Sequence, residues 1–158
     1  MPVWAPCGQT PVVRVATQRD KINFYGTLDL STGRETVTET TVLNAEHTAE
    51  HLQQLLAAYS EQPILLLWDR APWHYGDAIN SILLANPRLE VMYFPTATPD
   101  LNPQEHVWKA TRQAVSHNHG LRHLPDLAGR FKRHLVDHAF TSSFLDHYGY
   151  NAVCPMFM

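Results

Sequence analysis

The stretch Pro63-Ile64-Leu65-Leu66-Leu67-Trp68-Asp69 decides the fold class of this chain. Residues 64–68 are apolar without interruption, which is typical of a strand covered on both faces in a parallel sheet. Asp69 ends this run, and ligands of open α/β sheets gather at the carboxyl ends of strands. An ionised carboxylate in that position is costly unless it is solvated, paired or bound to a cation. Asp69 is therefore a candidate ligand, while a simpler role in starting the turn around Pro72 stays open.

The segments on both sides of this strand indicate an alternation of strands and helices. Further strands are predicted at 12–16, 21–30, 34–43 and 89–94, and helices at 44–59, 75–85, 103–118 and 124–138, whereas 140–158 is hard to assign. Strands that meander first and then alternate with helices predict an α/β fold, a mixed sheet flanked by helices. We expect residues 1–158 to form a single domain, because neither a repeat nor a low-complexity linker interrupts the chain.

Two of the predicted elements carry patterns that can be checked. In 21–30, one face carries the apolar Ile22, Phe24, Leu28 and Leu30, and the other carries Asn23, Tyr25, Thr27 and Asp29, an alternation that favours a strand. The threonine-rich segment 34–43 predicts an antiparallel edge strand. In 44–59, Asn44 is a plausible N-cap, and Leu52, Leu55, Leu56 and Tyr59 follow helical spacing, which predicts one buried stripe.

Composition is that of a globular protein with a core. The chain has 158 residues, of which 44% are apolar and 17% are charged. No apolar stretch approaches the roughly 20 residues that span a bilayer, and the N-terminus lacks the pattern of a secretory leader. Cys7 and Cys154 give neither a disulfide framework nor zinc spacing. We therefore expect an intracellular protein without a membrane partner.

Charge is distributed unevenly along the chain. The net charge is −3, yet residues 109–134 carry six Lys or Arg against one Asp, which is 6 − 1 = +5. This stretch is either a solvated helix face or a surface that contacts phosphates. His117, His119 and His123 suggest a metal site, but they lack a clear fourth ligand, and surface histidines explain them better.

A second carboxylate begins the predicted helix at 103–118. Asn102 as N-cap, Pro103 at the first helical position and Glu105 at the third resemble a capping box, which needs no catalysis. The same geometry allows Glu105 to point from the first helical turn toward a metal ion. Neither acid decides the matter alone.

Taken together, these segments resemble the DDE transposases of the insertion-sequence, Tc and mariner superfamily. That family shows Asp-Asn-Ala-x-x-His after an apolar strand, and this chain has Asp69-Arg70-Ala71-Pro72-Trp73-His74. The family's Pro-x-Tyr-Ser-Pro-Asp-Leu-Asn-Pro-Ile-Glu-x-x-Trp corresponds to residues 95–108. Thirty-five residues lie between Asp69 and Glu105, as between the second and third acids of the family. A Trp-Ala-Pro-x-Gly element is present at 4–8.

The resemblance implies a ribonuclease-H-like fold in which Asp69 and Glu105 are catalytic acids that bind two Mg²⁺ or Mn²⁺ ions. Such ions activate the attacking hydroxyl and stabilise the leaving oxygen during phosphodiester cleavage and strand transfer. Further residues are implied to lie next to the metal ligands or close to DNA. They are Arg70, His74, Asn102, Lys109 and Arg112. The implied partner is DNA, both transposon ends and target, and the implied location is cytoplasmic and DNA-associated.

The chain also departs from the family. Arg70 stands where Asn is commoner, and Thr96 and Ala97 replace the usual Pro-Tyr pair. The first acid of the family lies on a strand upstream of the Trp-Ala-Pro element, so we expect this acid and the first strand to be missing. Asp20 in a turn and Asp29 on a strand are poor substitutes. We expect the isolated chain to be inactive in strand transfer and to self-associate or need a complementing N-terminal fragment, because a missing strand exposes backbone edges.

Two alternative interpretations of the chain stay open. One is a non-catalytic remnant of the same fold that binds nucleic acid or a transposase subunit through residues 109–134. The other is an unrelated α/β domain whose helix cap imitates the motif.

Overall fold

The computed structural model describes residues 21–96, 101–116 and 123–141, which form four strands and four helices. In chain order these elements are β1 (Asn23–Leu28), β2 (Glu35–Thr40), α1 (Ala45–Ala58), β3 (Ile64–Trp68), α2 (Asp77–Ala85), β4 (Leu89–Tyr93), α3 (Pro103–Thr111) and α4 (Leu124–Asp137). A 3₁₀ turn at Pro72–His74 precedes α2, and a π-helical turn at Arg112–Ser116 follows α3. The predicted strand at 12–16 and the segment 142–158 lie outside the described residues.

The four strands form two separate two-stranded sheets. β1 and β2 are an antiparallel hairpin in which Asn23 faces Thr40 and Leu28 faces Glu35. β3 and β4 are parallel, with Ile64 beside Leu89 at one end and Trp68 beside Tyr93 at the other. Parallel and antiparallel strand pairs are therefore both present, as in a mixed sheet. Among the described residues, however, no strand pairing joins the two sheets.

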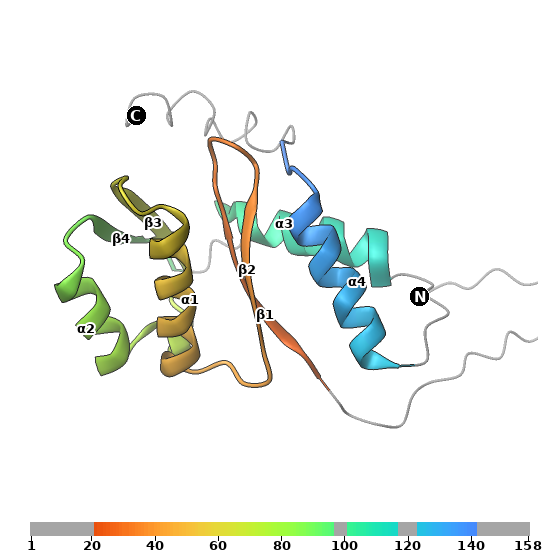
Figure 1. Cartoon of the computed structure of the whole chain (residues 1–158), viewed down its shortest axis with the longest axis horizontal. Helices are drawn as coiled ribbons and strands as arrows, with labels where there is room; N and C mark the ends of the chain where they lie inside the picture. The colour runs from red at the N-terminus through yellow and green to blue at the C-terminus, as the bar shows by residue number, and fades with distance from the viewer. Residues whose placement is uncertain (1–20, 97–100, 117–122, 142–158) are drawn as a thin grey trace, which may run out of the picture.

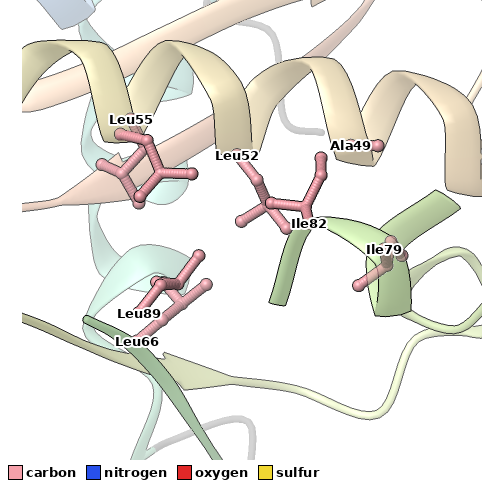
Figure 2. Close-up of a cluster of buried hydrophobic side chains, with 8 residues drawn as sticks. Ala49, Leu52, Leu55, Leu66, Ile79, Ile82 and Leu89 are labelled. Carbon is pink, nitrogen blue, oxygen red and sulfur yellow. The ribbon is translucent and has the colours of Figure 1, made fainter. Parts of the chain in front are cut away.

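Helix α1 packs against both sheets. Figure 2 shows its Leu52 and Leu55 directed toward Leu66 of β3 and Leu89 of β4, with Ile82 of α2 next to Leu52. Each of these five side chains is at least nine-tenths buried. Leu56 is also buried and Tyr59 packs at the rim, so the stripe predicted for this helix is confirmed.

Both ends of α1 are held by side chains. At its start the Asn44 carboxamide oxygen accepts from His47 N at 2.8 Å, which confirms the predicted N-cap. At its end the Arg88 guanidinium donates to the carbonyls of Leu56, Tyr59 and Gln62. Carbonyls at the C-terminal end of a helix lack donors from a following turn, so the bonds to Leu56 and Tyr59 cap α1 and anchor the start of β4.

The other face of the hairpin is covered by α3 and α4, as Figure 1 shows. Val37 of β2, Val107 of α3 and Leu135 of α4 form a second core in which each side chain is at most 5% exposed. Phe24 of β1 stacks on Phe131 of α4 at 5.3 Å between ring centroids. The hairpin therefore lies between two helical layers.

Both faces of β1 are covered, whereas one face of the parallel sheet is not. Tyr25, on the face of β1 opposite Phe24 and Leu28, is only 6% exposed, because that face packs against α1. Its hydroxyl donates to Asn44 O at 3.0 Å and accepts from Asn44 N at 3.1 Å, so the buried oxygen is satisfied. On the other sheet, Leu65 and Met92 are 46% and 56% exposed, so one face of β3–β4 that was predicted to be covered is open.

Gly26 of β1 lies where α3 approaches the hairpin most closely. A Cβ atom at this position would come within 2.7 Å of the Trp108 ring, 2.7 Å of Glu35 Oε2 and 2.9 Å of Gln104 Nε2. The absence of a side chain is what permits this contact. Gly26 therefore sets the distance between β1 and α3.

Glu35 and His51 are buried titratable groups on the two faces of the hairpin. Burial raises the pKa of Glu35 to about 8, although its Oε2 accepts a hydrogen bond from Gln104 at 3.1 Å. Its Oε1 is buried and has no hydrogen-bond partner. Burial and the nearby His74 lower the pKa of His51 to about 4, and its ring nitrogens lie 2.9 Å from Thr27 Oγ and 2.8 Å from Thr38 Oγ.

None of the helices in the described part of the chain has the length and apolar character required to cross a membrane.

The substitution Gly26→Ala tests the contact between β1 and α3. The added methyl group overlaps the Trp108 ring and the Glu35 carboxylate, so we expect a loss of about 1–3 kcal/mol in the free energy of unfolding. Urea unfolding monitored by circular dichroism measures this loss. The control is Gly129→Ala on the exposed side of α4, where a Cβ meets nothing within 4 Å and helix propensity predicts a gain of up to about 1 kcal/mol. Equal effects at both positions would contradict the close contact.

The substitution Glu35→Gln tests the buried carboxyl group. The Glu35 carboxyl group loses its proton near pH 4.5 in the unfolded chain and only near pH 8 in the folded protein. Between these two pH values, ionisation of Glu35 therefore destabilises the fold increasingly as the pH rises. Glu35→Gln removes this cost, and we expect it to stabilise the protein by about 2–4 kcal/mol at pH 7.5 and by little at pH 4. Unfolding measured at both pH values, with exposed Glu90→Gln as control, gives the comparison. A gain independent of pH would show that Glu35 titrates normally.

Candidate active site

Asp69 lies at the carboxyl edge of the parallel sheet. It follows Trp68, the last residue of β3, and the neighbouring strand continues past this edge through a hydrogen bond from Phe94 N to Trp68 O at 2.8 Å. The loop after Asp69 is attached to α1, since the buried Thr48 hydroxyl lies 2.9 Å from Trp73 O. The backbone around Asp69 is thus held in place by hydrogen bonds, and Asp69 lies at the carboxyl edge of the sheet, where open α/β folds bind their ligands.

One oxygen of the Asp69 carboxylate is held by its own loop. Oδ1 accepts from Ala71 N at 3.0 Å and lies 2.8 Å from Nδ1 of His74, which is buried. Nδ1 is also 3.2 Å from the Asp69 carbonyl, so both of its neighbours are acceptors and this nitrogen carries the proton. The hydrogen bond from His74, opposed by partial burial and aided by Ala71 N, holds the pKa of Asp69 below its ordinary value.

The geometry accommodates both roles considered for Asp69. The bond to Ala71 N shows that the side chain does start the turn before Pro72. No hydrogen bond or ion pair among the described residues engages the second oxygen, Oδ2, and the side chain is 48% exposed. An ionised, oriented carboxylate with one oxygen open to solvent is suited to bind a cation.

Glu105 lies in the first turn of α3 on its solvent-facing side. The cap is confirmed, because Asn102 Oδ1 accepts from Gln104 N at 3.0 Å and Glu105 N donates to Asn102 O at 3.1 Å. The buried positions of α3 are Pro103, Val107 and Thr111, and the Glu105 side chain is exposed. Its carboxylate makes no hydrogen bond within the described ranges, so it is available to a ligand.

The donor chemistry of Asp69 and Glu105 suits Mg²⁺ or Mn²⁺, which prefer carboxylate oxygens. Residues 21–96, 101–116 and 123–141 contain no group of three His, Cys, Asp or Glu side chains placed to hold a metal ion. The described residues therefore contain two carboxylates of suitable chemistry but no complete set of metal ligands.

Asp29, one of the substitutes considered for the first acid, has another role. Its Oδ1 accepts from Ser31 N at 2.8 Å in the hairpin turn, and its Oδ2 accepts from the Tyr59 hydroxyl at 3.0 Å. Burial favours the neutral form, but these hydrogen bonds outweigh it and lower the pKa of Asp29. Tyr59 is at the C-terminal end of α1. Thr48, which contacts the Asp69 loop, lies about 16 Å from Tyr59 along the helix axis. Asp20 lies outside the described residues.

The basic residues of the 109–134 stretch that the structure describes are exposed on two helices. Lys109 and Arg112 lie at the end of α3 and the start of the π-helical turn, and Arg130, Lys132 and Arg133 lie on α4. Lys132 forms an ion pair with Glu39 at 3.8 Å. Arg130 and Arg133 line a hollow together with His134 and His138. His123 is exposed, and His117 and His119 lie outside the described residues.

Arg70 and several aromatic rings surround the Asp69 loop. The Arg70 guanidinium lies over the Tyr93 ring at 5.3 Å from its centroid, and Trp68 packs against His74 at 4.2 Å. Sequence reasoning singled out Arg70 and His74 but missed Trp68, Tyr75 and Tyr93. The available signal was the density of aromatic residues at the ends of two predicted neighbouring strands.

Comparisons with known proteins identify the family of this chain. The family model described as DDE superfamily endonuclease matches residues 1–128. The insertion element IS630 uncharacterized 39 kDa protein of Shigella sonnei is 27% identical over 117 residues, which are 73% of this chain and 34% of that protein. The chain thus spans about a third of this curated relative.

Three solved structures share the fold. The Mos1 mariner paired end complex with Mn has a TM-score of 0.64 at 17% identity, covering 98% of this chain and 47% of that one. The Mos1 strand transfer complex gives 0.63 at 16%, covering 99% and 47%. The Mos1 transposase paired-end complex with left transposon end gives 0.61 at 17%, covering 85% and 42%. The mixed α/β fold is therefore ribonuclease-H-like and similar to that of the Mos1 transposase, and the chain belongs to the DDE superfamily endonucleases.

Proposed function

We propose that this chain is the catalytic-domain portion of an insertion-sequence transposase that cleaves and joins DNA with divalent metal ions. The observation that carries the proposal is Asp69, ionised at the carboxyl edge of β3 and oriented by His74 with Oδ2 left open. Glu105 supplies a second exposed carboxylate from the start of α3. The spacing of these acids supports assigning them as two of the three carboxylates of an Asp-Asp-Glu site.

In this proposal each residue near the site has a separate task. Asp69 and Glu105 would hold Mg²⁺ or Mn²⁺, which would supply charge neutralisation at the scissile phosphate. His74 keeps the Asp69 carboxylate in one orientation, as outer partners of metal ligands do. Arg70 is exposed beside it and offers a cation to a phosphate. Asn102 caps the start of α3 and so helps to position Glu105. Lys109 and Arg112, further along this helix and in the turn that follows it, would contact phosphates of the DNA.

We further propose that the site is completed by a strand placed between β1 and β3 that brings the third acid. An isolated two-stranded sheet is marginally stable, and this structure contains two of them under one helix. A strand inserted between them would join both into one sheet. The strand would come from a segment outside the described residues or from a second chain, and without it we expect little or no strand transfer.

A second candidate function is non-catalytic binding of nucleic acid or of a transposase subunit. The observation that favours it is the absence of a three-ligand metal group from the described residues, together with the exposed basic residues of α3 and α4. Such a module would respond to DNA and to salt but not to metal ions.

Thermal melting with Mn²⁺ separates the two functions. If Asp69 and Glu105 bind the ion, saturating Mn²⁺ raises the melting temperature by about 3–5 °C, because a ligand that binds only the folded state stabilises it. We expect this shift to be lost in Asp69→Asn and in Glu105→Gln. The control Asp77→Asn removes an exposed acid at the start of α2 and keeps the shift.

Two outcomes of this experiment would contradict the enzyme proposal. One is the same melting temperature with and without Mn²⁺, in a protein that still binds duplex DNA. The other is a shift that survives the Asp69→Asn and Glu105→Gln substitutions together, since the ion would then bind elsewhere.

Sedimentation of the purified chain tests the open strand edges. We expect it to self-associate with increasing concentration, because β1 and β3 each have a single strand partner in the described structure. A fragment that supplies the third acid and its strand should shift the population toward a defined complex and sharpen thermal unfolding. A chain that stays monomeric over a wide concentration range and melts cooperatively alone would contradict the open-edge proposal.

A further inference from the structure

Four rings form a continuous series beside the Asp69 carboxylate. Trp68 packs against His74 at 4.2 Å and stacks on Tyr93 at 6.4 Å, and Tyr93 stacks on Tyr75 at 5.6 Å. We call Trp68, His74, Tyr75 and Tyr93 the aromatic ladder. The planes of Trp68 and Tyr93 differ by 11° and those of Tyr75 and Tyr93 by 7°, so three of the rings are almost parallel.

The ladder is built by the sheet and by the loop that follows β3. Trp68 and Tyr93 are register neighbours at the ends of two parallel strands, which places their side chains next to each other. His74 is fixed to Asp69 at 2.8 Å, and the loop is attached to α1 through Thr48. The ladder is therefore coupled to the carboxylate by direct contacts.

One end of the ladder is buried and the other faces solvent. His74 is only 8% exposed, whereas Tyr75 is 46% exposed although its ring is aligned with that of Tyr93. The exposed Arg70 extends over the Tyr93 ring, 5.3 Å from its centroid, so a planar cation contacts the same ring on which the exposed Tyr75 stacks. Core packing accounts for His74 and Trp68 but gives no reason for an aligned aromatic ring and a guanidinium at the surface.

We propose that Tyr75 and Arg70 form a stacking platform for an unpaired nucleobase of a DNA strand whose backbone passes Asp69. This inference rests on the proposed function and names the form of DNA that the site accepts. A base has an apolar face that stacks on tyrosine, and a guanidinium both stacks on rings and pairs with phosphates. A paired base inside a duplex cannot offer its face, so the platform selects a strand end or an opened base pair next to the scissile phosphate.

Binding of fluorescent DNA by the full chain tests the platform. The probes are a blunt duplex and the same duplex with a short 3′ overhang that carries 2-aminopurine, whose fluorescence falls when it stacks. We expect the overhang to bind about tenfold more tightly than the blunt duplex and its fluorescence to be quenched. Tyr75→Ala should abolish the preference and the quenching, while Tyr75→Phe, which keeps the ring, should retain both.

Two further variants distinguish base stacking from attraction by positive charge and from the loss of any exposed apolar side chain. Arg70→Lys keeps the positive charge and loses the planar group, so we expect the preference for the overhang to fall while affinity for the blunt duplex changes little. Met92→Ala truncates an exposed apolar side chain of β4 that belongs to no ring contact, and it should behave as the parent chain. Circular dichroism confirms that each variant is folded.

The outcomes separate this inference from the proposed function. Equal affinity for both probes, or quenching that persists in folded Tyr75→Ala, overturns the platform and leaves the metal experiment with Asp69 and Glu105 unaffected. A chain that binds neither probe overturns the platform and removes the DNA on which the proposed function depends. Overhang preference without any response to Mn²⁺ supports the platform and favours the non-catalytic binding module.

Discussion

The packing of helix α1 against two separate strand pairs is the constraint on which the rest of the structure depends. Neither pair would be stable alone, and the described residues contain no strand pairing that joins them. Leu52 and Leu55 of α1 cover the parallel pair, while His51 on the same helix is bonded to Thr27 and Thr38 of the hairpin. A single helix thus replaces, by side-chain packing, the backbone hydrogen bonds that a continuous sheet would provide.

The same helix positions the candidate site. Thr48 contacts both the Tyr25 hydroxyl of the hairpin at 3.1 Å and the Trp73 carbonyl in the Asp69 loop at 2.9 Å. The Thr48 hydroxyl has one proton and donates to only one of these two oxygens at a time. Its oxygen nevertheless lies within hydrogen-bond distance of both, between β1 and the loop after β3. This buried contact holds the loop after Asp69 against the hairpin, on which α3, the helix that carries Glu105, also packs. The carboxylate itself is then oriented by His74, and the aromatic ladder extends from that histidine to the surface.

Much of the fold was accessible from the sequence because its signals are local. The apolar run 64–68, the stripe on 44–59 and the caps at Asn44 and Asn102 each depend on neighbours within a few residues, and all are confirmed. The exposure of Leu65 was not predicted, because an apolar run identifies a strand without saying which helix covers each of its faces. Glu35 gave no signal, since its burial under α3 depends on Gly26, nine residues earlier, and on Trp108. The roles of Asp69 and Glu105, and the single-domain organisation, stay predictions.

The sequence by itself determined the described strands and helices, their order and the positions of two candidate acids, because side-chain spacing and chain polarity encode these directly. Only the tertiary structure decided that the strands lie in two sheets, that His74 and Ala71 occupy one oxygen of Asp69, and that Arg70 lies over Tyr93. Trp68 and Tyr93 are 25 positions apart in the chain and become neighbours through parallel pairing. Contacts of this kind depend on how whole elements pack, which no local pattern specifies.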